Sequence, residues 1–197
     1  MSQNPIAVHF QQSLAALQRA ANDTTLLAAA SEIAVTIIDA LRSGNKVLLI
    51  GNGGSAADAQ HIASEIVGRY RKERPGYAAI ALTTDTSALT AISNDYGFER
   101  IFCRQIESLG RPGDILLALS TSGRSPNILT ALDAARRLGL VTAGFTGLKG
   151  QSLREVCDHL LVAPSDDTPV IQQIHMTAAH AICDTVEHAL ADGDSDR

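Results

Sequence analysis

The chain has 197 residues, a formal net charge of -5 and 45% hydrophobic residues. This length is enough for one well-buried domain and too short for two, so we expect a single domain over residues 1–197. The negative charge argues against nonspecific binding to nucleic acid. Because only 4% of the residues are aromatic and none is tryptophan, the core must be built from alanine, leucine, isoleucine and valine.

The termini and the cysteines indicate a cytoplasmic protein. No apolar stretch approaches the about 20 residues that span a bilayer, and the start, Met1 to Pro5, lacks the basic and apolar pattern of a signal peptide. We therefore expect no membrane contact. Cys103, Cys157 and Cys183 are odd in number and stand in apolar settings, which is typical of reduced, buried thiols.

Helical and strand patterns alternate along the chain after two N-terminal helices. We expect helices at 5–21, 24–41, 55–70, 84–92, 99–109, 126–138 and from about 168, a helical turn at 153–156, and strands at 47–50, 78–82, 115–119, 141–145 and 159–162. The N-terminal helices fill residues 5–43, an α/β core fills 45–190, and an acidic tail at 191–197 frays. This order predicts a doubly wound parallel sheet, covered on both faces, with sites at the carboxyl ends of its strands.

The second N-terminal helix is apolar over more than one face. Its apolar residues are Leu26, Leu27, Ala30, Ile33, Ala34, Ile37, Ile38 and Leu41. A single small domain buries only one face of such a helix, so we expect an oligomer interface here.

A glycine-rich turn follows the first strand, where residues 47–58 read VLLIGNGGSAAD. Ser55 stands where a helix N-cap belongs, and Asp58 completes a capping box. Gly53 and Gly54 let an anion approach the backbone at the positive end of the helix, so we expect a phosphate here. The spacing fits neither Walker A nor GxGxxG. Taken alone, the turn is also compatible with a tight connection that binds nothing.

A second polar turn, residues 120–127, follows the third strand and reads STSGRSPN. Ser125 takes the cap position of the next helix and Pro126 its first position. Its hydroxyl groups and amides suit the hydrogen bonds that a phosphate accepts. An ordinary capped turn is the alternative, and Arg124 either assists the phosphate or faces water.

Two helices carry the residue types that proton transfer and metal binding need. His61 and Glu65 are one turn apart and share a face, although a surface pair gives the same spacing. On the final helix, Gln173 and His180 align closely, while Gln172 and His180 diverge by roughly 80°. Both glutamines remain within reach of one site.

Together these motifs resemble the sugar isomerase (SIS) domain family and, within it, the bacterial phosphoheptose isomerases, over about residues 30–190. The resemblance rests on Gly51, Asn52, Gly53, Gly54 and Ser55 with Asp58, Gln60, His61 and Glu65; on Asn94 and Asp95; on Ser120, Thr121, Ser122 and Gly123 with Ser125; and on Ile171, Gln172, His175 and His180. The chain departs from the family at Lys149-Gly150-Gln151, where paired glycines are usual, and in its acidic tail. Neither departure touches the chemistry.

The resemblance implies a doubly wound five-stranded parallel sheet and a homotetramer with active sites at subunit junctions. It implies one zinc ion per subunit, held by His61, Glu65, Gln172 and His180. The implied substrate contacts are Asn52, Gly53, Gly54, Ser55, Glu65, Asn94, Asp95, Ser120, Thr121, Ser122, Ser125 and Gln172. The implied reaction converts sedoheptulose 7-phosphate to D-glycero-D-manno-heptose 7-phosphate, for heptose biosynthesis, through an enediol.

An enediol mechanism needs a base at carbon and an acid at the carbonyl oxygen. Our hypothesis is that Glu65 moves the proton between C1 and C2 while His180 shuttles protons among the oxygens. Noncatalytic SIS relatives that bind phosphosugars and associate with the bacterial replication initiator are the alternative class. Those relatives typically lack both residues, so the sequence favours the isomerase. An SIS protein acting on another phosphosugar also remains open, because phosphate loops do not measure sugar length.

Overall fold

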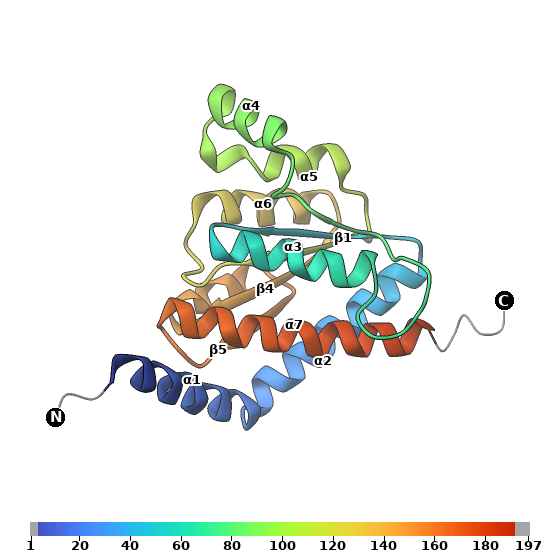
Figure 1. The fold of residues 1–197 in the computed structure, drawn as a ribbon. Coiled ribbons are helices and arrows are strands. Elements are labelled where there is room, and N and C mark those ends of the chain that lie inside the picture. The colour runs from blue at the N-terminus through green and yellow to red at the C-terminus, as the bar shows by residue number, and fades with distance from the viewer. Residues whose placement is uncertain (1–3, 192–197) are drawn as a thin grey trace.

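The computed structural model describes residues 4–191 and contains a five-stranded parallel sheet in the order β2-β1-β3-β4-β5 (Figure 1). The strands are β1 (Val47–Gly51), β2 (Ala79–Ala81), β3 (Ile115–Leu119), β4 (Val141–Gly147) and β5 (His159–Ala163). The helices are α1 (Pro5–Ala21), α2 (Thr24–Arg42), α3 (Gly54–Val67), α4 (Thr86–Tyr96), α5 (Cys103–Leu109), α6 (Pro126–Arg137) and α7 (Thr168–Ala191), with short 3-10 helices η1 (Phe98–Arg100) and η2 (Leu148–Glu155). The predicted fold class is confirmed.

Helices cover both faces of the sheet, which explains why its central strands are apolar throughout. In β1, Val47 and Leu49 pack with α1, α2, α3 and α7, whereas Leu48 and Ile50 pack with α5 and α6. Successive side chains of a strand point to opposite faces, and every residue of β1 and of β3 is buried. A parallel sheet buried on both sides therefore replaces the alternating pattern of a half-exposed sheet.

Helix α2 corrects one expectation from the sequence. By length and composition alone it is apolar enough to cross a membrane, although no such stretch was expected. Its 19 residues contain many alanines, which make it less conspicuous than a leucine-rich span. Ile33 and Ile37 are buried in the core beside the sheet, while Leu27 and Val35 are 47% and 56% exposed. A core helix passes the same test.

Several element boundaries also differ from expectation. Helix α3 starts at Gly54 and ends at Val67, before the predicted end at residue 70, and α4 runs on to Tyr96. Of the tail predicted to fray, only Ala191 lies within the described residues, where it ends α7. The cysteines are free thiols, as predicted, and Cys103 and Cys183 are buried, whereas Cys157 is only partly buried.

The strand order places a topological switch point between β1 and β3. These two strands are neighbours, with Gly51 aligned to Leu119. The helix that follows β1, α3, packs on one face of the sheet, and the helix that follows the β3 turn, α6, packs on the other. The two connections diverge, and ligands of such sheets bind in the crevice between them.

Candidate active site

The two polar turns predicted from the sequence meet at this switch point and line a small pocket of about 60 Å³. Its lining residues are Asn52, Ser55, Leu119, Ser120, Thr121, Ser122 and Ser125. Six of these seven are polar residues proposed from the sequence as substrate contacts. The structure thus brings together side chains about 70 residues apart, in a pocket whose lining of hydroxyl groups suits a phosphate.

The glycine turn is built differently from the predicted capping box. Gly53, with φ of 56°, is the N-cap of α3, and no side chain caps this helix end. The prediction that Ser55 is the N-cap was wrong, because Gly53, with its positive φ, takes the cap position two residues earlier and Ser55 falls inside the first turn. A Cβ atom on Gly54 would lie 2.5 Å from Gln172 Nε2. Glycine is therefore required there for Gln172 to rest on the turn.

Asn127 is a residue of the site that the sequence analysis gave no role. It is buried, and its amide exchanges two hydrogen bonds with the amide of Asn52, at 2.8 and 2.9 Å. This pair fixes the glycine turn to the start of α6. The sequence signal for this residue was its position directly after Ser125 and Pro126 at the start of a helix. That signal is weak, because exposed polar residues are also common there.

The serine turn is held by its own hydroxyl groups. Ser120 Oγ accepts a hydrogen bond from the Gly123 amide at 3.1 Å, and Ser122 Oγ accepts one from the Arg124 amide at 3.3 Å. Ser125 is the N-cap of α6, as predicted, but its side chain makes no capping hydrogen bond. Its hydroxyl group remains available to a ligand in the pocket.

A second cluster forms where α3 and α7 run side by side (Figure 1). His61 Nε2 lies 3.0 Å from Glu65 Oε1, and His180 Nε2 lies 3.5 Å from His61 Nε2. One ligand atom from each of these residues lies within 4.8 Å of the others, close enough to hold a metal ion. Two imidazoles and a carboxylate form a donor set that Zn²⁺ accepts. These residues therefore fit the implied zinc ion.

Gln172 reaches the glycine turn from α7. It projects from α7, as His180 does, and its Nε2 lies 3.5 Å from Ser55 Oγ. The structure thus places the fourth implied zinc ligand against the glycine turn, beside Ser55 of the pocket.

Burial perturbs two titratable residues near these motifs. Burial raises the pKa of Asp58, although the charge of His61 acts to lower it. His175 is fully buried with its Nε2 3.1 Å from the Thr146 carbonyl oxygen, and burial lowers its pKa to about 4, against the effect of that hydrogen bond. His175 is therefore a neutral core residue at pH 7.

Asn94 and Asp95 are not brought to the pocket within one chain. Both are exposed in the last turn of α4, a helix without buried residues, and the Asn94 amide donates to Asp95 at 2.8 Å. Neither lines the pocket at the ends of β1 and β3.

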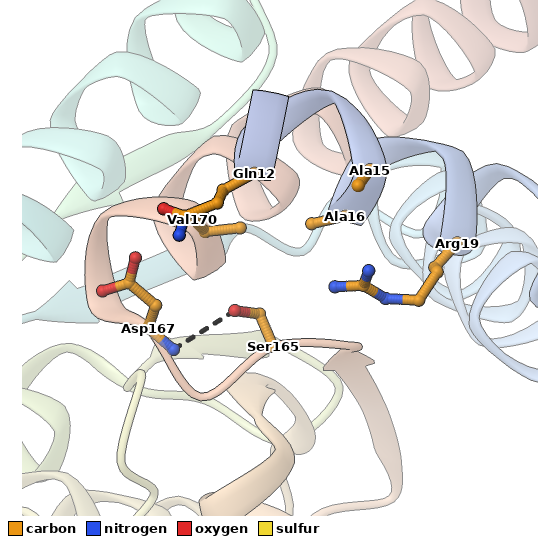
Figure 2. A pocket seen from close by; sticks show the side chains of 7 residues that line it. All are labelled: Gln12, Ala15, Ala16, Arg19, Ser165, Asp167 and Val170. Atoms are coloured by element: carbon orange, nitrogen blue, oxygen red, sulfur yellow. Dashed lines mark hydrogen bonds between the residues drawn. The ribbon is translucent and has the colours of Figure 1, made fainter. Parts of the chain in front are cut away.

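A larger pocket, of about 420 Å³, lies away from all these residues, between α1 and the start of α7 (Figure 2). It is lined by Gln12, Ala15, Ala16, Arg19, Ser165, Asp167 and Val170, and Figure 2 shows the Asp167 amide donating to Ser165 Oγ. Arg19 donates to the Pro164 carbonyl oxygen at 3.2 Å. No residue proposed from the sequence for substrate or metal lies here, so size alone does not identify the site.

Comparison with known families defines the class of this protein. The sequence profile of the SIS domain matches residues 9–147. The chain belongs to the SIS domain family, in agreement with its doubly wound sheet and the polar pocket at its switch point.

Closer relatives define its group within that family. A phosphoheptose isomerase from Bradyrhizobium sp. (strain BTAi1) is 68% identical over 185 residues, covering 94% of this chain and 93% of that protein. One from Trichlorobacter lovleyi is 52% identical over 188 residues, covering 95% of each. The structure of phosphoheptose isomerase GmhA from Neisseria gonorrhoeae matches with a TM-score of 0.87 at 41% identity, over 93% of this chain and 97% of that one. That of a phosphoheptose isomerase from Francisella tularensis matches with a TM-score of 0.89 at 38% identity, over 93% and 96%. Within the SIS family, the chain is grouped with the phosphoheptose isomerases.

Proposed function

We propose that this protein is a ketose–aldose isomerase that converts sedoheptulose 7-phosphate to D-glycero-D-manno-heptose 7-phosphate, for heptose biosynthesis. The observation that carries the proposal is the convergence of Glu65 and His180 from two helices beside a hydroxyl-lined pocket. The names and high identity of the relatives support the same reaction. Residues 1–197 act in this proposal as one SIS domain.

In this proposal the pocket binds the phosphate, and the cluster on α3 and α7 carries out proton transfer. Hydroxyl groups of Ser55, Ser120 and the following residues of that turn hold the phosphate, which does not react. Glu65 takes the proton from C1 and returns it at C2. His180 moves protons between the two oxygens, so that no full negative charge builds up on the oxygens of the enediol. The Asn52–Asn127 amide pair keeps the two turns in register.

The proposal includes one zinc ion per subunit, held by His61, Glu65, Gln172 and His180. The close approach of the ligand atoms of His61, Glu65 and His180 supports this zinc site. A bound zinc ion supplies Lewis-acid polarisation of carbonyl and diol oxygens. Gln172 is a neutral, weak ligand, so we expect a lower zinc affinity than that of an all-histidine or thiolate site.

We further propose a homotetramer, in the cytoplasm, with active sites at subunit junctions. Ile6, Phe10 and Leu14 form a stripe along α1 and are 57 to 71% exposed. A groove beside it is almost wholly apolar and is lined by Leu17, Ala20, Ala21, Leu26, Leu27, Ala30, Ile174, Thr177, Ala178 and Ala181. Contiguous exposed apolar surface of this kind marks an interface. In such an assembly, Asn94 and Asp95 on the unburied α4 reach the site of a neighbouring subunit.

The deciding experiment incubates the purified protein with sedoheptulose 7-phosphate and follows the heptose product by NMR. We expect turnover that depends on Glu65. Protein that binds the phosphosugar but gives no product, with or without added zinc, would instead support a noncatalytic SIS protein of the kind associated with the replication initiator. Faster turnover of a shorter or longer phosphosugar than of sedoheptulose 7-phosphate would contradict the proposed substrate but not the proposed class of reaction.

A further inference from the structure

The segment between α3 and β2, residues 68–78, is tied to α7 by one buried carboxylate. The side chain of Glu187 is 1% exposed. It accepts hydrogen bonds at 2.6 to 2.8 Å from the backbone N–H groups of residues 70–72, and a fourth from Arg74 Nε at 3.1 Å. The Arg74 side chain is only 3% exposed. Four donors on one carboxylate satisfy its buried charge and fix the path of the segment.

Arg74 extends this link to the end of α3. Its Nη2 donates to the Glu65 carbonyl oxygen at 2.8 Å, and its Nη1 donates to the carbonyl oxygens of Ile66 and Gly68, both at 3.0 Å. A helix leaves its last carbonyl groups unpaired, and Arg74 supplies their donors. The ion pair thus joins the backbone of Glu65 to α7.

The anchored segment places an aromatic ring against the other proton-transfer residue. The rings of Tyr70 and His180 are stacked, with centroids 5.6 Å apart and an interplanar angle of 27°. His180 meets His61 edge-on at 5.1 Å. His180 and Glu187 are seven residues apart on α7 and lie on the same face of that helix. Glu187, which anchors the backbone of Tyr70, and His180, on which the Tyr70 ring stacks, therefore face the same segment.

The charge state of Glu187 agrees with this role. Burial alone raises its pKa, but the backbone N–H groups of residues 70–72 and the Arg74 guanidinium outweigh burial, so the pKa of Glu187 lies below its ordinary value. The carboxylate is ionised at neutral pH.

We propose that Glu187 and Tyr70 are positioning residues of the isomerase. Glu187 anchors residues 70–72 so that the Tyr70 ring fixes the orientation of the His180 imidazole toward His61 and Glu65. Neither residue reacts with the substrate. The inference rests on the proposed function for its catalytic consequence, but the placement of the His180 ring is measurable without any turnover.

The test observes the His180 ring directly, in metal-free protein labelled with ¹³C at histidine Cε1. The signal is assigned by its loss in His180→Gln. Tyr70→Leu removes the ring current and moves the His180 signal, whereas Tyr70→Phe keeps the signal close to its original position. Glu187→Gln keeps the shape of the side chain but weakens the anchor, and it moves the His180 signal in the same direction as Tyr70→Leu.

A matched control separates positioning from general loss of stability. Asp114 is another buried carboxylate, paired with Lys46 and accepting backbone N–H groups, but at the amino ends of β1 and β3. Asp114→Asn weakens a comparable network and leaves the His180 signal in place. If Glu187→Gln does not fold, the comparison of Tyr70→Leu with Tyr70→Phe at the half-buried Tyr70 still tests the proposal.

Kinetics give the second readout. Tyr70→Leu lowers kcat about three- to tenfold, the scale of one aromatic contact, and changes KM less than about twofold, while Tyr70→Phe restores kcat. An unmoved His180 signal in folded Tyr70→Leu would overturn the proposal, as would equal kcat in the leucine and phenylalanine variants of an active enzyme. If the wild-type protein shows no turnover, the isomerase function fails, while the position of the His180 signal still decides whether the ring is placed by Glu187 and Tyr70.

Discussion

His180 Nε2 lies 3.5 Å from His61 Nε2, although the two residues are 119 positions apart in the chain. At this distance the two nitrogens cannot both carry a proton directed at the other. In a hydrogen bond between them one nitrogen donates and the other accepts, whereas in a metal site both direct their lone pairs at the ion. This arrangement, with Glu65 beside it, makes the cluster suited both to proton transfer and to zinc.

Removing either proton-transfer group should abolish most of the activity. Glu65→Gln and His180→Gln keep side-chain size, and each is expected to lower kcat at least roughly a hundredfold, the usual scale for a positioned acid or base. The double variant should lose less than the product of the two, because residues that act as a unit are not additive. Steady-state kinetics measure this, with light scattering to verify the assembly. Near-normal turnover in Glu65→Gln would rule out the mechanism.

Zinc should depend on the α3–α7 cluster and not on histidines elsewhere. His61→Ala removes one imidazole of the cluster, so the purified protein should carry less zinc by elemental analysis and lose activity. His188→Ala is the matched control, since His188 is an exposed histidine on α7 whose ring makes a hydrogen bond and an ion pair with Asp184 of its own helix. Equal zinc content in the two variants would count against this metal site.

The serine hydroxyl groups should act on binding more than on chemistry. Ser55→Ala and Ser120→Ala each remove a hydrogen bond to a phosphate that does not change during the reaction, so KM should rise while kcat changes little. Ser108→Ala, at an exposed serine of α5, serves as the control. A large loss of kcat with unchanged KM would mean that these hydroxyl groups touch the reacting end of the sugar.

The apolar stripe on α1 should hold subunits together. Phe10 is 71% exposed in the single chain, and Phe10→Glu places a charge where the proposed tetramer buries a ring. Multi-angle light scattering should show a tetramer for the wild-type protein and smaller species for the variant. His9→Glu is the control, because residue 9 lies about 100° around the same helix. A monomeric wild-type protein at micromolar concentration would contradict this prediction.

His175 should make stability fall in acid. Burial lowers its pKa to about 4, while the unfolded chain has the ordinary value near 6.5. The unfolded state therefore binds the proton first, so the stability that neutral His175 contributes is complete above about pH 6.5 and is lost as the pH falls toward 4, up to about 3 kcal/mol. Urea unfolding of wild type and His175→Gln across this range measures the difference. Parallel pH profiles would show that His175 is protonated equally in both states.

The sequence by itself determined the elements and the residue types of the site. Apolar runs such as residues 115–119, each followed by a polar turn, specify buried parallel strands because both faces of each strand need cover. His61 and Glu65 were paired correctly because four residues make one helical turn, a purely local relation. The family-specific motifs supplied the rest of the expected site.

Only the tertiary structure decided which distant side chains meet and how. Helix α3 starts at Gly54, because Gly53 with its positive φ takes the cap position ahead of Ser55, and Gln172 approaches Gly54 from α7. The Asn52–Asn127 pair arises where α6 packs beside the turn after β1, and the stack of Tyr70 on His180 arises where α7 packs against the segment between α3 and β2. Local propensity acts over a few residues, whereas these contacts depend on how whole elements pack, and no local spacing encodes that packing.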